Sequence, residues 1–364
     1  ESFLHQPVQN GYYDYQGVIH FHTNYSGDAT GTFEEISAVA NRQKVDFMIS
    51  TDHNTLQPLD DQREGWYQNT LFLVGEEISL DEGYLLALDI QHLKRLPDEK
   101  TEEIVADILN QGGMLLIAHP NHPKWRWRSE NEAGITGEEV LDFADQWYTA
   151  GTLALIKGLS FYPFNPSAAF FQLYERPDET LRGWDKRNLK QKTVGIFAPD
   201  FHQAVRITRE FKIPFPGVES VLPLAHDHIL LKNPFSRNLM NDRKSLYDAL
   251  RKGHLYFAMD LIGNAAGFFF SARQENQTAW MGDQLPSGTQ TYFSVRLPPV
   301  AAGRTTLIRV LKNGVTLFTS GEREFHFQSS GEGAYRIEVE TGIPTFWGSH
   351  KNVVWIYSNP IYLR

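Results

Sequence analysis

The sequence predicts an α/β fold, with a barrel at residues 1–264 and a small β-sandwich at residues 265–364. Three observations lead to this prediction. Apolar strand patterns alternate with amphipathic helix patterns in the first part of the chain, which indicates parallel strands joined by helices. Ionisable residues recur where these strands end, as they do at the carboxyl face of a barrel. After about Ala265 the pattern changes to short strands and turns.

The expected elements of the barrel follow one another closely. Thr32 and Glu35 form a capping box, which predicts a helix that runs to about Gln43. Gly112-Gly113 and Gly253 are expected to end two later helices. The tail at residues 1–16 has no periodicity and is expected to wrap the first strand. The expected helices span residues 32–43, 102–111, 136–150, 180–190 and 243–252, and the expected strands span 18–22, 45–50, 71–74, 84–90, 114–118, 154–159, 193–198 and 255–259.

The C-terminal part is expected to hold short strands at residues 268–272, 291–297, 307–312, 315–320, 335–340 and 353–357. Asn313-Gly314 between two of them is a strong signal for a β-hairpin, because both residues tolerate positive φ. Short strands separated by turns predict a small, immunoglobulin-like β-sandwich. We expect this sandwich to pack against the barrel and to contribute no residue to a metal site.

The composition is that of a globular protein. The 364 residues exceed what one core ordinarily holds, and 41% hydrophobic with 13% aromatic residues excludes general disorder. A formal net charge of −10 argues against a nucleic-acid partner, which would need a basic face. No apolar run approaches the roughly 20 residues that a membrane-spanning helix requires. Because there are no cysteines, imidazole and carboxylate must carry any metal or catalytic chemistry.

Two features of the sequence bear on where in the cell the protein is located. The sequence begins at Glu1 without a methionine, which leaves room for a targeting segment that has been removed. A cysteine-free, aromatic-rich chain with an added β domain suits the periplasm. We therefore favour export over the cytoplasm.

The most informative stretch is residues 17–54. His20 and His22 lie two apart on an expected strand, so both imidazoles point to the same face. A His-x-His pair alone is a weak signal, because alternating polar residues are common on strands. Asp28 follows a turn after the pair, and the next apolar strand ends in Asp52 and His53. This repetition at two strand ends predicts a metal site.

Three later segments repeat the pattern of an apolar strand that ends in metal-binding residue types. They are Val-Gly-Glu-Glu-Ile-Ser (74–79), Leu-Leu-Ile-Ala-His-Pro (115–120) and Gly-Ile-Phe-Ala-Pro-Asp-Phe-His (195–202). With these segments the chain resembles the PHP family of metal-dependent phosphoesterases. Segments 249–254 and 355–362 resemble parts of CehA/McbA-type metallohydrolases, which carry a β domain after the barrel. The resemblance implies a distorted seven-stranded (β/α) barrel.

The resemblance also implies a set of metal ligands. One ion would be held by His20, His22, Glu77 and Asp200, and a second by Asp28, His53 and His202. A third would share Glu77 with His119 and with a histidine whose place is taken here by Tyr84, so we expect fewer than the family's three ions. Imidazole and carboxylate ligands favour zinc, iron or manganese over calcium. Asp52 and Glu76 are expected to lie behind the ligands and orient them.

Metal ions held in this way would activate water for attack at phosphorus, so the leading hypothesis is a phosphoesterase acting on a small organic phosphate. Lys124, Arg126 and Arg128 on the loop after His119 are candidates for binding the phosphate, although a solvated charged loop is equally common. The alternatives are the hydrolysis of an amide, carbamate or ester, and a non-catalytic, metal-stabilised binding module. His226 and His228 lie outside the motifs and are interpreted as non-ligands.

Overall fold

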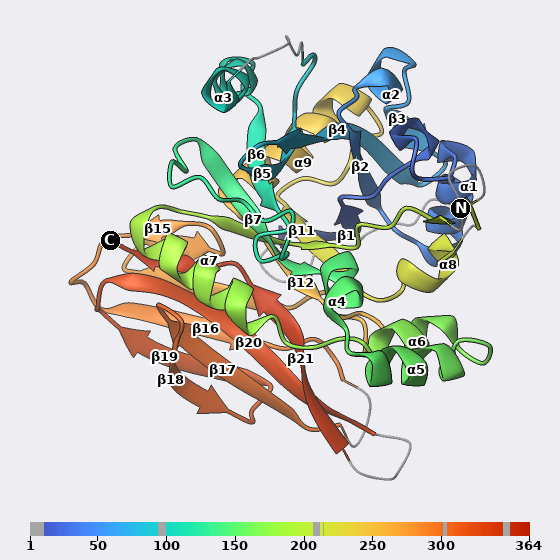
Figure 1. Cartoon of the computed structure of the whole chain (residues 1–364). Helices are drawn as coiled ribbons and strands as arrows, with labels where there is room; N and C mark the ends of the chain where they lie inside the picture. Colours follow the sequence, from blue (N-terminus) through green and yellow to red (C-terminus); the bar gives the residue numbers. More distant parts are fainter. Residues whose placement is uncertain (1–10, 94–99, 207–211, 214, 301–303, 345–349) are drawn as a thin grey trace.

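A computed structural model describes residues 11–93, 100–206, 212–213, 215–300, 304–344 and 350–364 (Figure 1). A barrel with surrounding helices lies beside a C-terminal β region, and α7 (Asp178–Lys190) crosses between them. The first strand begins at Tyr13. Residues 1–10 of the tail, for which we expected a wrapping role, lie outside the described residues.

The remaining described helices are α1 (Phe33–Gln43), α2 (Gln57–Asp60), α3 (Thr101–Asn110), α4 (Phe143–Thr149), α5 (Thr152–Phe161), α6 (Pro166–Phe171), α8 (Val218–Val221) and α9 (Leu239–Lys252), with the 3-10 helix η2 (Asn24–Ser26). The predicted capping box of α1 is present, because the backbone N–H of Glu35 donates to Thr32 Oγ1 and that of Thr32 donates to the Glu35 carboxylate. In the part of the chain that the structure describes, we find no helix with the length and apolarity needed to span a bilayer.

The strands of the barrel region are β1 (Tyr13–Ile19), β2 (Phe47–His53), β3 (Gly65–Tyr67), β4 (Thr70–Leu80), β5 (Gly83–Leu88), β6 (Met114–Ala118), β7 (Ile135–Asp142), β8 (Val194–Ala198), β11 (His226–Leu231) and β12 (Leu255–Ala258). β9 (Val205–Arg206) and β10 (Lys212–Ile213) pair separately. The sheet order is β12-β11-β1-β2-β4-β5-β6-β7-β8, and the α/β fold class is confirmed.

The alternation of strands and helices predicted parallel strands throughout the barrel. This prediction is only partly right. Parallel pairing holds for β1-β2-β4 and for β6-β7-β8. β5, β11 and β12 run antiparallel to their neighbours. The two residues between β4 and β5 are the reason in one case, because so short a link can join only antiparallel strands.

The segments that follow β1 and β8 bring two distant strand ends together. The backbone N–H of His22 donates to the carbonyl of Phe201, and that of Asp200 donates to the carbonyl of His20, both at 3.0 Å. His20, His119 and Asp200 have φ values of 73°, 51° and 41°. Positive φ costs energy for residues other than glycine, and such residues cluster at functional sites.

Two predicted elements are wrong. A single helix was predicted for residues 136–150, but they form β7 and then α4. The pattern at Thr136–Glu139 is not a capping box, because Glu138 and Glu139 are buried in β7 between two neighbouring strands. Residues 154–159 lie within the helix α5 rather than in a strand. A short apolar run does not distinguish a buried strand from a helix, and here the tertiary structure decided.

The C-terminal strands are β13 (Phe269–Gln274), β14 (Gln277–Trp280), β15 (Gln284–Leu285), β16 (Thr291–Arg296), β17 (Thr306–Lys312), β18 (Val315–Ser320), β19 (Glu324–Ser329), β20 (Gly333–Pro344), β21 (His350–Ser358) and β22 (Ile361–Leu363). All six predicted strands are present. The hairpin at Asn313-Gly314 is also present, with φ values of 53° and 80° and Lys312 paired with Val315.

The C-terminal β region consists of two unlike parts. β13, β14, β16 and β19 form their own four-stranded sheet. β21 pairs with β12, so the other sheet continues into the barrel without interruption. A domain boundary at residue 265 stays a prediction, since hydrogen bonding crosses that position.

Candidate metal centre

Four of the predicted ligands converge at the carboxyl edge of the barrel. All four are buried, and they lie in or just after three strands: His20 and His22 follow β1, Glu77 lies in β4, and Asp200 follows β8. The Nε2 atoms of the two histidines lie 3.1 Å apart. Each Nε2 lies 3.3–3.4 Å from Glu77 Oε2 and 3.0–3.3 Å from Asp200 Oδ1.

These separations suit one small metal ion. Ligand atoms at the usual zinc distances in a tetrahedron lie about 3.3 Å from one another. The five separations that involve a histidine nitrogen, 3.0–3.4 Å, fall around this value. Two imidazole nitrogens and two carboxylate oxygens are also a donor set that zinc, iron and manganese accept.

The hydrogen bonds of the histidines leave both Nε2 atoms without a proton in the neutral rings. His20 Nδ1 donates to Glu139 Oε1, so its Nε2 is a bare acceptor. His22 Nδ1 lies 3.0 Å from Ser26 Oγ, whose own proton goes to Asp52. In neutral rings the two Nε2 lone pairs face each other across 3.1 Å. Burial lowers the pKa of both histidines, but the carboxylates around them outweigh burial and raise it, so this place favours positive charge, either a proton or a metal ion.

Two carboxylate oxygens lie in the same place. Among the described residues, Asp200 Oδ1 is buried and accepts no well-directed hydrogen bond, and Glu77 Oε2 lies 2.8 Å from His53 Nδ1. Buried polar atoms are normally paired, so each unpaired atom calls for an explanation. A metal ion held by the two histidines would lie near both oxygens. The residues present therefore fit a bound divalent ion.

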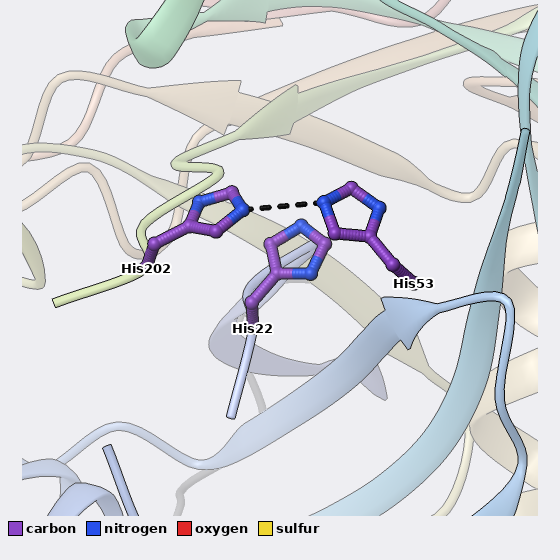
Figure 2. Close-up of side chains that lie close together, drawn as sticks. All are labelled: His22, His53 and His202. Carbon is purple, nitrogen blue, oxygen red and sulfur yellow. Dashed lines mark hydrogen bonds between the residues drawn. The ribbon is translucent and has the colours of Figure 1, made fainter. Parts of the chain in front are cut away.

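Asp28, His53 and His202 form a second cluster nearer to solvent. Figure 2 shows the imidazoles of His53 and His202 facing each other beside His22, with their Nε2 atoms 3.3 Å apart. Asp28 Oδ2 lies 3.4 Å from His53 Nε2 and 3.7 Å from His202 Nε2. The structure thus brings together the three residues that were predicted to hold a second ion. Their role as ligands stays a prediction.

The predicted third position is only half formed. His119 Nε2 lies 3.2 Å from Glu77 Oε1, which leaves Glu77 able to face two ions. Tyr84 lies at the same edge, with its ring centroid 6.0 Å from that of His119. A neutral phenol is a poorer ligand than imidazole. We therefore keep the expectation of fewer than three ions.

The pKa values of the site reflect burial and the close approach of histidines and carboxylates. Burial raises the pKa of Glu77, but nearby histidines outweigh burial and hold it well below its ordinary value. Burial lowers the pKa of His53, but hydrogen bonds to Asp28 and Glu77 outweigh it and raise the pKa to about 10. Burial and the neighbouring His22 lower the pKa of His202 to about 4. The lowered pKa values of Glu77 and Asp200 favour the ionised carboxylates, which are the forms that bind a cation.

Three acidic residues that the sequence analysis did not select orient two of the histidines. Glu139 accepts from His20 Nδ1 and, at 2.8 Å, from the backbone N–H of His119. His119 Nδ1 lies 2.9 Å from Asp142 Oδ2 and 3.1 Å from Asp145 Oδ1. A signal for the first two did exist, because the run from Glu139 to Asp142 places carboxylates beside Val140-Leu141 near a strand end. The assignment of this segment to a helix concealed it.

Replacing Glu139 with glutamine should weaken metal binding about 10- to 100-fold, because partners of ligating histidines contribute this much. The change keeps the size of the side chain but removes the negative charge that His20 contacts. Metal affinity is measured by competition with a chromophoric chelator. The control is Glu138→Gln, which alters the opposite face of β7, where Glu138 pairs with Arg187. Equal losses in both variants would contradict the role of Glu139.

Of the two residues expected to orient ligands, Asp52 does so indirectly. Its Oδ1 accepts from Ser26 Oγ at 2.9 Å, and Ser26 in turn lies 3.0 Å from His22 Nδ1. Asp52 therefore acts on His22 through Ser26. Glu76 precedes Glu77 in β4, and alternation along a strand points it to the other face.

His226 and His228 belong to a separate network, and their interpretation as non-ligands stays a prediction. His226 Nδ1 lies 2.8 Å from Asp260 Oδ2, and His228 Nε2 lies 2.9 Å from the same oxygen. His228 Nδ1 lies 2.9 Å from Asp14 Oδ1. Among the described residues, the groups of three or more whose ligand atoms all lie within 4.8 Å of one another fall within residues 20–202.

A cavity of about 530 Å³ opens onto both clusters, and Lys124 lines it. Arg126 is exposed and does not line the cavity, and Arg128 donates to the backbone carbonyls of Asp81 and Lys124. The predicted group of three phosphate-binding cations is therefore not assembled at the cavity in this structure, where only Lys124 is in place. Binding by the two arginines stays a prediction.

Comparisons with known proteins find distant structural similarity alone. No family model and no curated protein matches the chain. The chain is similar to a two-domain protein from Bacteroides vulgatus that contains a predicted PHP-like metal-dependent phosphoesterase, with 12% identity and a TM-score of 0.46 over 97% of this chain and 100% of that chain. It is also similar to an amidohydrolase from Chromobacterium violaceum with bound sulfate and no metal, with 15% identity and a TM-score of 0.31 over 51% of this chain and 87% of that chain. Neither similarity places the chain in a family.

Proposed function

We propose that this protein is a metal-dependent hydrolase and that its reaction is the hydrolysis of a phosphate ester. One observation supports this most strongly, namely the buried group in which two imidazole nitrogens lie 3.1 Å apart and each lies within 3.4 Å of Glu77 Oε2 and of Asp200 Oδ1. The resemblance of the strand-end motifs to PHP phosphoesterases supports the choice of a phosphate ester.

The chain's own residues define what the site does. His20, His22, Glu77 and Asp200 would hold one ion, and Asp28, His53 and His202 a second. Divalent ions bound there supply a water nucleophile at neutral pH and offset the charge that develops on the attacked group. Glu139 holds His20 in the orientation that binding requires. Lys124 lines the cavity beside the ligands, where its ammonium can pair with a phosphoryl oxygen.

Hydrolysis of an amide, carbamate or ester is a second candidate, and one observation favours it. Among the described residues that line the cavity, Lys124 is the only lysine or arginine. A phosphate dianion usually meets several cationic groups besides metal, whereas a neutral ester needs none.

Replacing Lys124 with methionine should decide between the two candidates. For a phosphate ester, kcat/KM should fall about tenfold or more, because a charge-assisted hydrogen bond contributes about 1.5–3 kcal/mol. For a neutral ester it should change little. The measurement compares phenyl phosphate with phenyl acetate, with and without added metal, and checks metal content in each sample.

Arg126→Met is the matched control, since it removes a positive charge from the same loop outside the cavity. It should leave both substrates unaffected. Equal losses from Lys124→Met and Arg126→Met on phenyl phosphate would instead support the sequence-based group of phosphate-binding cations. A metal-loaded protein that turns over neither substrate, nor an amide, would support the binding module.

A further inference from the structure

The cavity over the candidate metal centre has two unlike sides. One side carries the ligand clusters and Lys124. The other is built by α4, α6, the segment at 215–216 and α8. Its side chains are apolar or aromatic, and they include Trp147, Phe170, Leu173, Phe215, Val221 and Leu224.

The aromatic side is packed firmly rather than formed by isolated rings. The ring centroid of Trp147 lies 5.3 Å from that of Phe170 and 6.2 Å from that of Phe215. Phe170 and Phe215 are 6.0 Å apart. Tyr162 packs behind them, 5.7 Å from Phe170 and 4.9 Å from Phe215. Such contacts hold each ring in place, so the apolar surface exists before a ligand arrives.

This side offers few partners for polar groups. Apart from the ligand clusters, the hydrogen-bonding side chains among the described lining residues are those of Tyr84, Lys124, Trp125, Trp147 and Tyr148. Trp125 lies toward the metal side, since its ring centroid is 5.6 Å from that of His119. A sugar or nucleoside against the apolar side would leave hydroxyl groups unpaired, which is costly. A hydrocarbon group there removes apolar surface from water.

We propose that the substrate is a phosphate ester of an apolar alcohol or phenol. Its phosphoryl group lies between the ligand clusters and Lys124, and its apolar group packs against Trp147, Phe170 and Phe215. Water supplies the oxygen of the new bond to phosphorus, the ester bond from phosphorus to oxygen breaks, and the leaving oxygen takes up a proton. The products are the apolar alcohol and inorganic phosphate. This inference rests on the proposed function, because it takes the clusters as the place of the scissile bond.

Binding of non-hydrolysable phosphonates to the metal-reconstituted full chain tests the inference without turnover. Benzylphosphonate should bind about 30-fold more tightly than methylphosphonate, because its ring leaves water. Dihydroxypropylphosphonate, of similar reach but polar, should bind within about twofold of methylphosphonate. Calorimetry gives the three dissociation constants. If the polar compound binds as tightly as the benzyl compound, the inference is overturned.

Two variants connect this preference to the apolar side of the cavity. Trp147→Ala removes part of that side, and Ala144→Phe fills the space beside it without removing a packed ring. Each should reduce the ratio of benzyl to methyl affinity to less than about fivefold. Phe164→Ala is the control, because Phe164 is 87% exposed and outside the cavity lining. A ratio that falls equally in the control, or in none of the variants, contradicts the assignment.

A neutral pair of ligands separates this inference from the proposed function. N-benzylacetamide and N-methylacetamide carry the same two apolar groups without a phosphonate. If only this pair shows the benzyl preference, the apolar side of the cavity binds the hydrocarbon group as proposed, but the substrate is not a phosphate ester. If phosphate esters are hydrolysed but neither pair shows the preference, the proposed function stands and this inference fails.

Discussion

Replacing His20 with alanine should remove at least one equivalent of bound metal per chain and lower kcat/KM more than about 100-fold. The residue supplies one of the four atoms that surround the central position, and the loss of even a partner of such a ligand weakens metal binding about 10- to 100-fold. Elemental analysis of protein never exposed to chelator gives the metal content. Wild-type protein should contain at least one equivalent of zinc, iron or manganese.

His226→Ala is the matched control for this experiment. His226 is also buried and also bound to a carboxylate, with Nδ1 2.8 Å from Asp260 Oδ2, but it lies in a different network. Its replacement should lower the free energy of unfolding by about 1–3 kcal/mol and leave metal content near wild type. Similar metal losses in the two variants would show that the wrong pair of histidines has been chosen. Wild-type protein without metal, even after reconstitution, would remove the basis of the proposed function.

Replacing Arg336 with methionine should lower the free energy of unfolding by about 3–5 kcal/mol, because it leaves the buried carboxylate of Asp185 without its cation and leaves Glu338 paired with Arg176 alone. Arg336 in β20 donates to both oxygens of Asp185 in α7 at 2.7 Å and to Glu338 at 2.6 Å. These contacts join the helix of the barrel region to the C-terminal sheet. Urea denaturation of metal-loaded protein, followed by tryptophan fluorescence, measures the loss.

The control for Arg336 lies one strand away. Arg309 in β17 pairs with Glu340 at 2.7 Å, but its side chain is 36% exposed, whereas that of Arg336 is 2% exposed. Arg309→Met should therefore change the free energy of unfolding by no more than about 1 kcal/mol. Comparable losses in the two variants would mean that burial does not set the cost.

Local signals predicted the elements whose causes are local. The capping box at Thr32 and the turn at Asn313-Gly314 appear as expected, because each depends on hydrogen bonds or backbone angles within a few residues. Residues 136–142 are the counter-example. Their pattern satisfies the rule for a helix start, yet they form β7 between β6 and β8. Pairing with distant strands outweighed the local preference.

The positions of the predicted ligands also followed from the sequence. His20, His53, His119 and Asp200 each come at or just after the carboxyl end of an apolar strand, and parallel strands bring such ends to one edge. What the pattern did not reveal is which carboxylates orient them. Glu139 contacts His20 across a separation of 119 residues, and no periodicity in the chain encodes that contact.

The sequence by itself determined the residue types of the candidate site, their placement at strand ends and the β-rich character of the C-terminal part. These features follow from short-range hydrophobic periodicity and turn chemistry. Only the tertiary structure decided that Lys124 and not Arg126 lines the cavity, that Trp147 and Phe215 share its apolar side, and that β21 continues the sheet of the barrel. Each of these depends on how segments far apart in the chain pack together, and that packing is set by the sum of many weak contacts rather than by any local pattern.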